Sequence, residues 1–189
     1  PEAWIILDAA ISNGIQIGVD ATLDGWMLLS GTESLPPAIL ATFREAAELQ
    51  ASVFPALVFL ESMAALGVAW WARTRFLDEG DQGLGPLHEF RFNDHLVWVL
   101  VAGLVLVLMQ FGEAFARVGS NVVVFMGGLY AMRGVAVFMF ISGGLSLFGF
   151  VMFCLGIVLA APLVLGIAVL VGVGDTWLDL RSRVRQLTA

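Results

Sequence analysis

Apolar residues fall into long blocks that charged or turn-rich stretches separate. An α-helix rises 1.5 Å per residue, so about 20 apolar residues cross a hydrocarbon core of about 30 Å. The pattern predicts an all-α, polytopic membrane protein with about four to five transmembrane helices plus amphipathic interfacial helices. The predicted spans cover Ser52–Ala72, Asp94–Gly112, Asn121–Ile141 and Leu145–Val173.

The last block, Leu145–Val173, is too long for one untilted crossing, and Pro162 predicts a kink within it. Arginines gather in the loop before the second span and in the tail, so the positive-inside rule predicts both segments to be cytoplasmic. Three spans between them would place them on opposite sides. Either the last block is a broken pair of shorter helices near Pro162, or one charge signal misleads. The arginines are Arg73, Arg75 and Arg91 in the loop, and Arg181, Arg183 and Arg185 in the tail.

The first fifty residues differ from the rest, because polar residues recur at four-residue intervals in an otherwise apolar stretch. On a helix this spacing makes one slowly drifting polar stripe. The stripe is consistent with a surface helix that has one solvent-exposed face, or with a membrane helix whose stripe lines a cavity. We expect residues 1–50 to form this part, including an amphipathic helix over Ala38–Gln50, and residues 51–189 to form the bundle and a C-terminal amphipathic helix. The stripe comprises Asp8, Ser12, Gln16, Asp20 and Asp24.

Composition supports the membrane interpretation, since 59% of residues are hydrophobic and 13% are charged, with a mean hydropathy of +0.91. The net charge is −7, and all nine basic residues are arginines, which disfavours nucleic acid as a partner. The lipid bilayer is the expected environment. The lone Cys154 is interpreted as a small hydrophobe. Because the chain begins at Pro1, we expect a fragment of a longer protein.

Motifs for catalysis are missing from the sequence. It contains no Gly-x-x-x-x-Gly-Lys, no His-Glu-x-x-His, no Gly-x-Ser-x-Gly and no cysteine cluster. We therefore expect no enzyme and no cofactor. His88, Asp94 and His95 lack a specific metal-binding pattern, so no metal site is predicted, and Asp94 is expected to cap a helix. Asp175 is expected to cap the C-terminal helix.

Arg133 is the charge inside the long apolar stretch Asn121–Val173. An arginine at a helix centre costs about 2.5–3.5 kcal/mol on insertion scales, and each Leu, Ile, Phe or Val returns roughly 0.3–0.6 kcal/mol. Glu61 lies at a matching depth in its own span, which suggests an ion pair. Three interpretations stay open: a structural pair, an unpaired arginine that snorkels or is solvated, or a site where Arg133 binds an anionic group. Tyr130, one turn earlier, and Gln110 complete the candidate set.

Three segments carry a family resemblance: HEFRFNDHLVW, NVVVFMGGLYAMRGVAVFMF and GDTWLDLRSR. They resemble the C-terminal half of the YybS-like family, which comprises bacterial multi-span membrane proteins of unknown function, over roughly residues 38 to 185. Asn93 stands where that family usually has proline. The family is distantly similar to the substrate-binding subunits of energy-coupling-factor vitamin transporters. The resemblance implies a solute-binding protein of the bacterial inner membrane that works with other membrane subunits or partner ATPases.

Two functions therefore remain: a small-solute-binding or transport component, or a structural or assembly protein of the bacterial cell envelope. A pocket containing Arg133 and polar side chains from another helix would favour the first. A dry, closed contact between Glu61 and Arg133 would favour the second.

Overall fold

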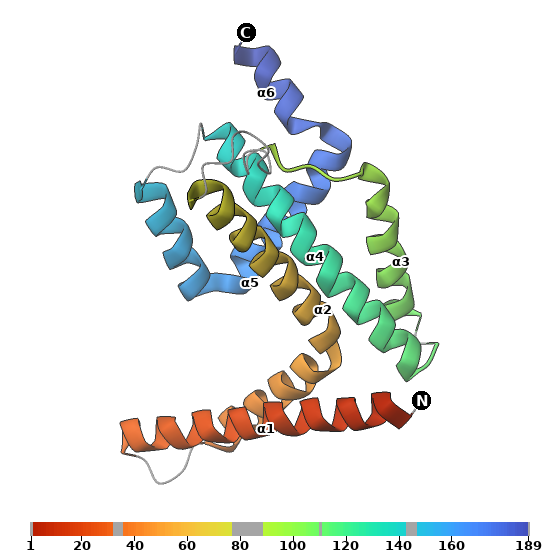
Figure 1. Cartoon of the computed structure of the whole chain (residues 1–189), viewed down its shortest axis with the longest axis vertical. Helices are drawn as coiled ribbons and strands as arrows, with labels where there is room; N and C mark the ends of the chain where they lie inside the picture. Colours follow the sequence, from red (N-terminus) through yellow and green to blue (C-terminus); the bar gives the residue numbers. More distant parts are fainter. Residues whose placement is uncertain (1, 32–35, 77–88, 110, 143–146, 189) are drawn as a thin grey trace. The chain divides into compact units, whose positions relative to one another are not determined.

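The computed structural model describes residues 2–31, 36–76, 89–109, 111–142 and 147–188, and these segments are helical without a strand. The all-α fold is therefore confirmed. In chain order the elements are α1 (Glu2–Ser30), α2 (Pro37–Phe76), the short 3-10 helix η2 (Asp94–Leu96), α3 (Val97–Leu108), α4 (Glu113–Ile141), α5 (Leu147–Leu178) and α6 (Leu180–Thr188) (Figure 1).

Within these described segments, three helices are long and apolar enough to cross a membrane: Pro37–Trp70, Glu113–Ile141 and Val151–Leu178. The predicted span Asp94–Gly112 is a shorter apolar helix over Asp94–Leu108. At 1.5 Å per residue its length is about 22 Å, less than a full hydrocarbon core. The predicted helix over Ala38–Gln50 and the span after it form one continuous helix, α2.

The chain divides into two compact units, and the boundary lies inside α2 between Pro55 and Ala56. The first unit contains α1, which carries all five residues of the polar stripe. Asp8 and Ser12 are half-buried, whereas Gln16, Asp20 and Asp24 are exposed. α1 is not among the helices of membrane-spanning length and hydropathy.

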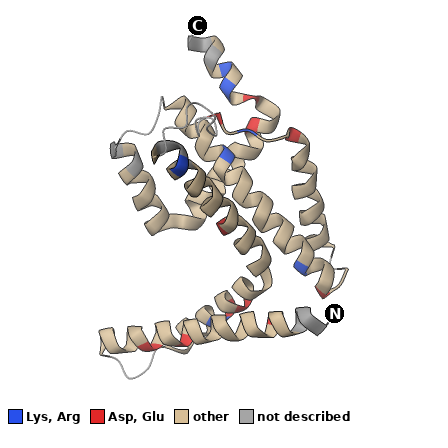
Figure 2. Cartoon of the chain, viewed as in Figure 1, with Lys and Arg blue, Asp and Glu red and all other residues tan. Residues whose placement is uncertain are grey.

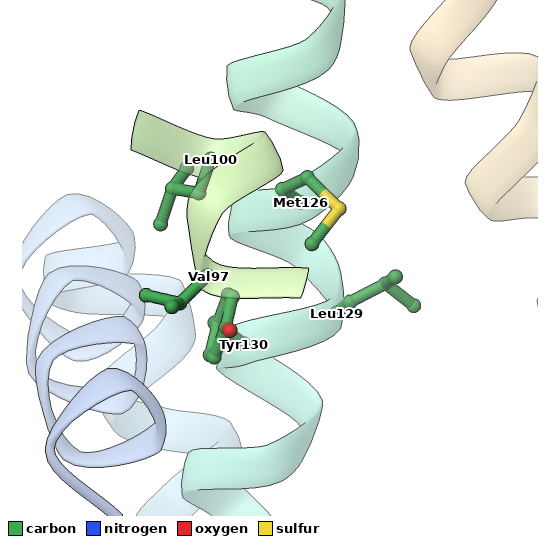
Figure 3. Packing of buried hydrophobic residues seen from close by; sticks show 5 residues of the cluster. All are labelled: Val97, Leu100, Met126, Leu129 and Tyr130. Atoms are coloured by element: carbon green, nitrogen blue, oxygen red, sulfur yellow. The ribbon is translucent and has the colours of Figure 1, made fainter. Parts of the chain in front are cut away.

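In the second unit, α4 packs against both α3 and α5 (Figure 1). A cluster of buried side chains lies where α3 and α4 pack together, and Figure 3 shows Leu129 directed away from the side of α4 on which Val97, Leu100 and Tyr130 lie. These side chains belong to Val97, Leu100, Met126, Leu129 and Tyr130.

The second part of α2 contacts another face of α4. There the Ala56 backbone N–H donates to Asn121 Oδ1 at 2.9 Å. This N–H follows Pro55, which lies inside the helix and lacks an N–H of its own.

Glycines allow α4 and α5 to approach backbone to backbone. A Cβ at Gly134 would collide with the Ala168 carbonyl, and one at Gly172 would collide with the Tyr130 carbonyl. Small residues at four-residue spacing permit this kind of helix contact in membrane proteins. The close crossing holds the last part of α5 against the part of α4 that contains Arg133.

α5 is two helices that meet at a kink. Ala160 has non-helical angles of φ −148° and ψ 45°, two residues before Pro162. Figure 1 shows the two halves meeting at a sharp corner, so that both outer ends of α5 lie toward the end of the unit where α3 begins. The predicted kink is therefore present, and of the two interpretations of this block the structure has the broken pair of shorter helices.

Candidate functional site

Arg133 on α4 is completely buried, and two carboxylates contact its guanidinium. Its Nε donates to Asp175 Oδ2 at 3.0 Å, and its Nη1 donates to Asp94 Oδ1 at 2.7 Å. Both are charge-assisted hydrogen bonds, which are shorter and stronger than neutral ones. The arginine is therefore neutralised by carboxylates that lie far from it in the sequence.

The ends of two apolar helices supply these carboxylates. Asn93 caps η2, because its side chain accepts a hydrogen bond from the His95 backbone N–H at 3.0 Å. The carboxylate of Asp94 is thus left for Arg133, and the expectation that Asp94 is the cap is wrong. Asp175 lies in the last turn of α5 and not at the start of α6, so the expectation that it caps the C-terminal helix is also wrong.

Two further arginines extend the contacts toward the chain end. Arg181 on α6 lies 3.5 Å from Asp175 Oδ2, and its Nη2 donates to the Phe90 carbonyl at 2.9 Å. Arg91 Nη2 lies 3.8 Å from Asp94 Oδ2, and Arg91 Nη1 lies 3.5 Å from Asp179 Oδ1. We call the set Arg91, Asp94, Arg133, Asp175, Asp179 and Arg181 the arginine network.

The arginine network contains equal numbers of positive and negative side chains. Figure 2 shows charged residues of both signs gathered where η2 begins and where α5 meets α6. Burial lowers the pKa of the Arg181 guanidinium, and neighbouring Asp175 opposes that shift. Because an arginine pKa lies far above neutrality, Arg181 stays positively charged at physiological pH.

Aromatic rings form one wall of the site. The Phe92 ring centroid lies 5.4 Å from Arg133 Cζ, within range of a cation–π contact. The same ring packs edge to face against Tyr130, with centroids 5.0 Å apart and planes at 72°. The Tyr130 side chain is fully buried.

Three buried polar atoms of this site have no hydrogen-bond partner within the described part of the chain: Arg133 Nη2, Asp175 Oδ1 and the Tyr130 hydroxyl. The Tyr130 hydroxyl lies beside the Thr176 side chain, whose own hydroxyl donates to the Gly172 carbonyl at 3.5 Å and keeps lone pairs that can accept from Tyr130. A buried donor or acceptor without a partner costs about 1–3 kcal/mol. Arg133 Nη2 and Asp175 Oδ1 carry this cost at the centre of the site.

The structure does not bring all the predicted site residues together. Arg133 and Tyr130 lie together, whereas Glu61 is exposed on α2, and no ion pair of the described residues joins it to Arg133. The hypothesised Glu61–Arg133 pair is thus replaced by pairs with Asp94 and Asp175. Gln110 lies outside the described residues, and the polar stripe belongs to the other unit.

The predicted Glu61–Arg133 pair assumes that both residues lie at equal depth, and this depth depends on where each helix begins. α4 begins at Glu113, several residues before the predicted start of its span, and Arg133 lies beside the beginning of η2 and the last turn of α5. The sequence did hold one signal for the true partners. Asp94 and Asp175 are acidic residues at the borders of apolar blocks, where a carboxylate can reach a buried cation on a neighbouring helix.

Helices of membrane-spanning length, with a buried arginine neutralised at helix ends, define an integral membrane protein. Comparison with protein families agrees. The chain belongs to the family described as "Predicted membrane protein (DUF2232)", whose sequence profile matches residues 7–176. No curated protein and no solved structure matches the chain. The relation to energy-coupling-factor subunits stays a prediction.

Proposed function

We propose that this protein is a non-enzymatic structural component of a membrane assembly, located in the bacterial inner membrane. One observation carries the proposal: the arginine network joins residues 89–94, α4, α5 and α6 into a single charged junction. Segments almost a hundred residues apart in the chain meet there. The role that follows is to present the elbow, which we define as residues 89–96, and α6 in a fixed arrangement.

The energetics of buried ion pairs support a positioning role. Apolar residues can often replace a buried pair without loss of stability, whereas removing one partner leaves a costly unpaired charge. Such pairs therefore contribute little net stability but disfavour alternative arrangements of the segments that they join. In this protein, the arrangement so specified is that of the elbow and α6 on the end of α4.

Exposed side chains at this junction are suited to contacts with other molecules. Trp98 at the start of α3 and Trp177 at the end of α5 are each 67% exposed, and Arg183 on α6 is exposed. Tryptophan is enriched at membrane–water interfaces and at protein interfaces. We propose that another membrane subunit docks against α6 and the elbow.

Site-specific photo-crosslinking in native membranes tests this proposal. A photoreactive amino acid replaces Arg183 on α6, and a matched control replaces Val118, an exposed residue near the start of α4. We expect a discrete protein adduct from position 183 and none from position 118. Adding Arg181→Met should lower the yield, because it releases α6 from Asp175 and from the Phe90 carbonyl. A yield that Arg181→Met leaves unchanged would contradict the proposed role of the network.

Solute binding is the second function that the sequence left open. An anionic solute on Arg133 fits poorly, because Asp94 and Asp175 already neutralise this arginine and would repel a further anion.

A further inference from the structure

Glu61 is an exposed acidic residue inside a helix of membrane-spanning length, and it takes no part in the arginine network. We propose that the face of α2 around Glu61 binds a transmembrane helix of a different protein, through a lysine or arginine at the middle of that helix. This surface goes beyond the proposed docking at α6 and the elbow, because it lies on another helix and at the centre of the bilayer.

Contacts between α2 and α4 establish the depth of Glu61. A Cβ at Gly128, near the middle of α4, would lie 2.7 Å from the Leu60 side chain. The Phe59 ring packs edge to face against Phe125, with centroids 6.3 Å apart, and Figure 1 shows this part of α2 beside α4. Because α4 has membrane-spanning length, residues level with its middle lie near the bilayer centre. Glu61 follows Leu60 directly and therefore lies at this depth.

The described part of the chain leaves this stretch of α2 uncovered. Every residue of Glu61–Leu66, more than one helical turn, is exposed, and the Glu61 carboxylate makes no hydrogen bond or ion pair with a described residue. Trp70, of the type that marks a membrane interface, lies about 14 Å further along the helix, beyond the reach of a glutamate. Ionisable residues in transmembrane helices almost always face a bundle interior or a water-filled cavity, and pair there. Lipid alone is therefore a poor cover for Glu61.

Charge determines what the covering helix carries. A carboxylate in a medium of low dielectric strongly favours an opposite charge in contact with it. The membrane-spanning helices of this chain contain three basic residues, Arg44, Arg117 and Arg133. Arg133 is buried and paired with two aspartates, and the other two lie near the starts of their helices. A second copy therefore has no spare cation at the depth of Glu61, and the cation has to come from a different protein.

Small residues beside Glu61 suit a close contact between helices. Ala64 and Ala65 are exposed, and a Cβ at Gly67 would meet no atom within 4 Å. Small residues let transmembrane helices approach closely. A partner helix on this face would thus bring a basic side chain within reach of the carboxylate.

Designed transmembrane peptides test the charge requirement on the full chain in lipid vesicles. Two leucine–alanine helices differ only at the central residue, which is lysine or leucine, and fluorescence energy transfer measures their binding to the labelled protein. We expect the lysine peptide to bind roughly tenfold tighter, and Glu61→Leu to remove this preference. Met63→Leu, a matched change at an exposed neighbour, should keep it. Equal binding of the two peptides, or a preference that survives Glu61→Leu, would overturn the proposal.

Photo-crosslinking in native membranes identifies the occupant of this face. A photoreactive amino acid replaces Leu66, which is 71% exposed. We expect an adduct with a membrane-spanning segment of a different protein that carries a lysine or arginine, lost in Glu61→Leu and kept in Met63→Leu. An adduct with a second copy of this chain, adducts with lipid alone, or an adduct that persists in Glu61→Leu would refute it. The crosslink from position 183 reports on the other surface, so either proposal can fail alone.

Discussion

At the scale of single residues, Arg133 shows how a charge is accommodated in an apolar helix. Two aspartates at helix ends neutralise it, and an aromatic ring covers its face. The two aspartates differ in environment, because Asp175 is fully buried and the side chain of Asp94 is 46% exposed. This difference predicts unequal consequences when each carboxylate is removed.

Asp175→Ala should strongly destabilise the protein, because it removes the buried partner of Arg133. Breaking a buried pair in this way typically costs about 3–5 kcal/mol. The double variant Arg133→Met with Asp175→Leu should recover much of that loss, since it leaves no uncompensated charge on α4. The free energy of unfolding, measured in detergent by denaturant titration, checks both values. A double variant no more stable than Asp175→Ala would count against the pair.

Asp94→Asn should have a much smaller effect on stability. The side chain is close to half exposed, so water screens its charge, and exposed pairs contribute about 0–1 kcal/mol. Arg133 also retains Asp175 in this variant. The same titration, with both variants in one detergent, gives the comparison. An equal loss for Asp94→Asn and Asp175→Ala would refute the unequal roles.

The sequence identified Arg133 but not its partners, and the reason is physical. A lone charged residue in a long apolar segment can be found from the sequence alone, because the apolar neighbours in the segment predict that it is buried. Asp94 and Asp175 precede helical turns, where an aspartate commonly acts as a cap, so each had a local explanation. In the sequence, Asp94 and Asp175 lie 39 and 42 residues from Arg133. Their contacts with Arg133 therefore depend on how α3 and α5 pack against α4.

At the scale of helices, the apolar blocks were predictable because long runs of Val, Leu, Ile and Phe favour membrane-spanning helices. The sequence does not determine the reversal within α5, because Pro162 predicts a break but not its angle. Glycine gave a similarly incomplete signal. Only some glycines lie at helix crossings, and the sequence does not distinguish Gly134, which contacts α5, from Gly127, which has no atom within contact distance of an added Cβ.

Gly134→Ala and Gly127→Ala form a matched pair on α4. An added Cβ at Gly134 would collide with the backbone of Ala168, so α4 and α5 must separate, and overpacking of this kind costs about 1–3 kcal/mol. At Gly127 the space is open, and alanine should stabilise the helix by up to about 1 kcal/mol. Tm values in detergent should therefore move in opposite directions. If both substitutions changed Tm in the same direction, this would contradict the close crossing of α4 and α5.

At the scale of the whole molecule, the corner in α5 explains why two arginine-rich segments can share one side of the membrane. The chain passes down α3, up α4, and then down and up through the two halves of α5 (Figure 1). The elbow and α6 therefore meet at one end, as the Arg91–Asp179 and Arg181–Phe90 contacts require. A single straight α5 would separate these segments by the thickness of the bilayer.

Cysteine labelling in intact and opened bacterial cells tests this topology. Single cysteines replace Glu89 in the elbow, Arg183 on α6 and Glu113 at the start of α4, each of which is exposed, in a Cys154→Ala background. By the positive-inside rule, an impermeant maleimide should label positions 89 and 183 only in opened cells. Position 113, at the opposite end of α4, should react in intact cells. If positions 89 and 183 reacted under different conditions, α5 would cross the bilayer as one helix, and the arginine network could not form.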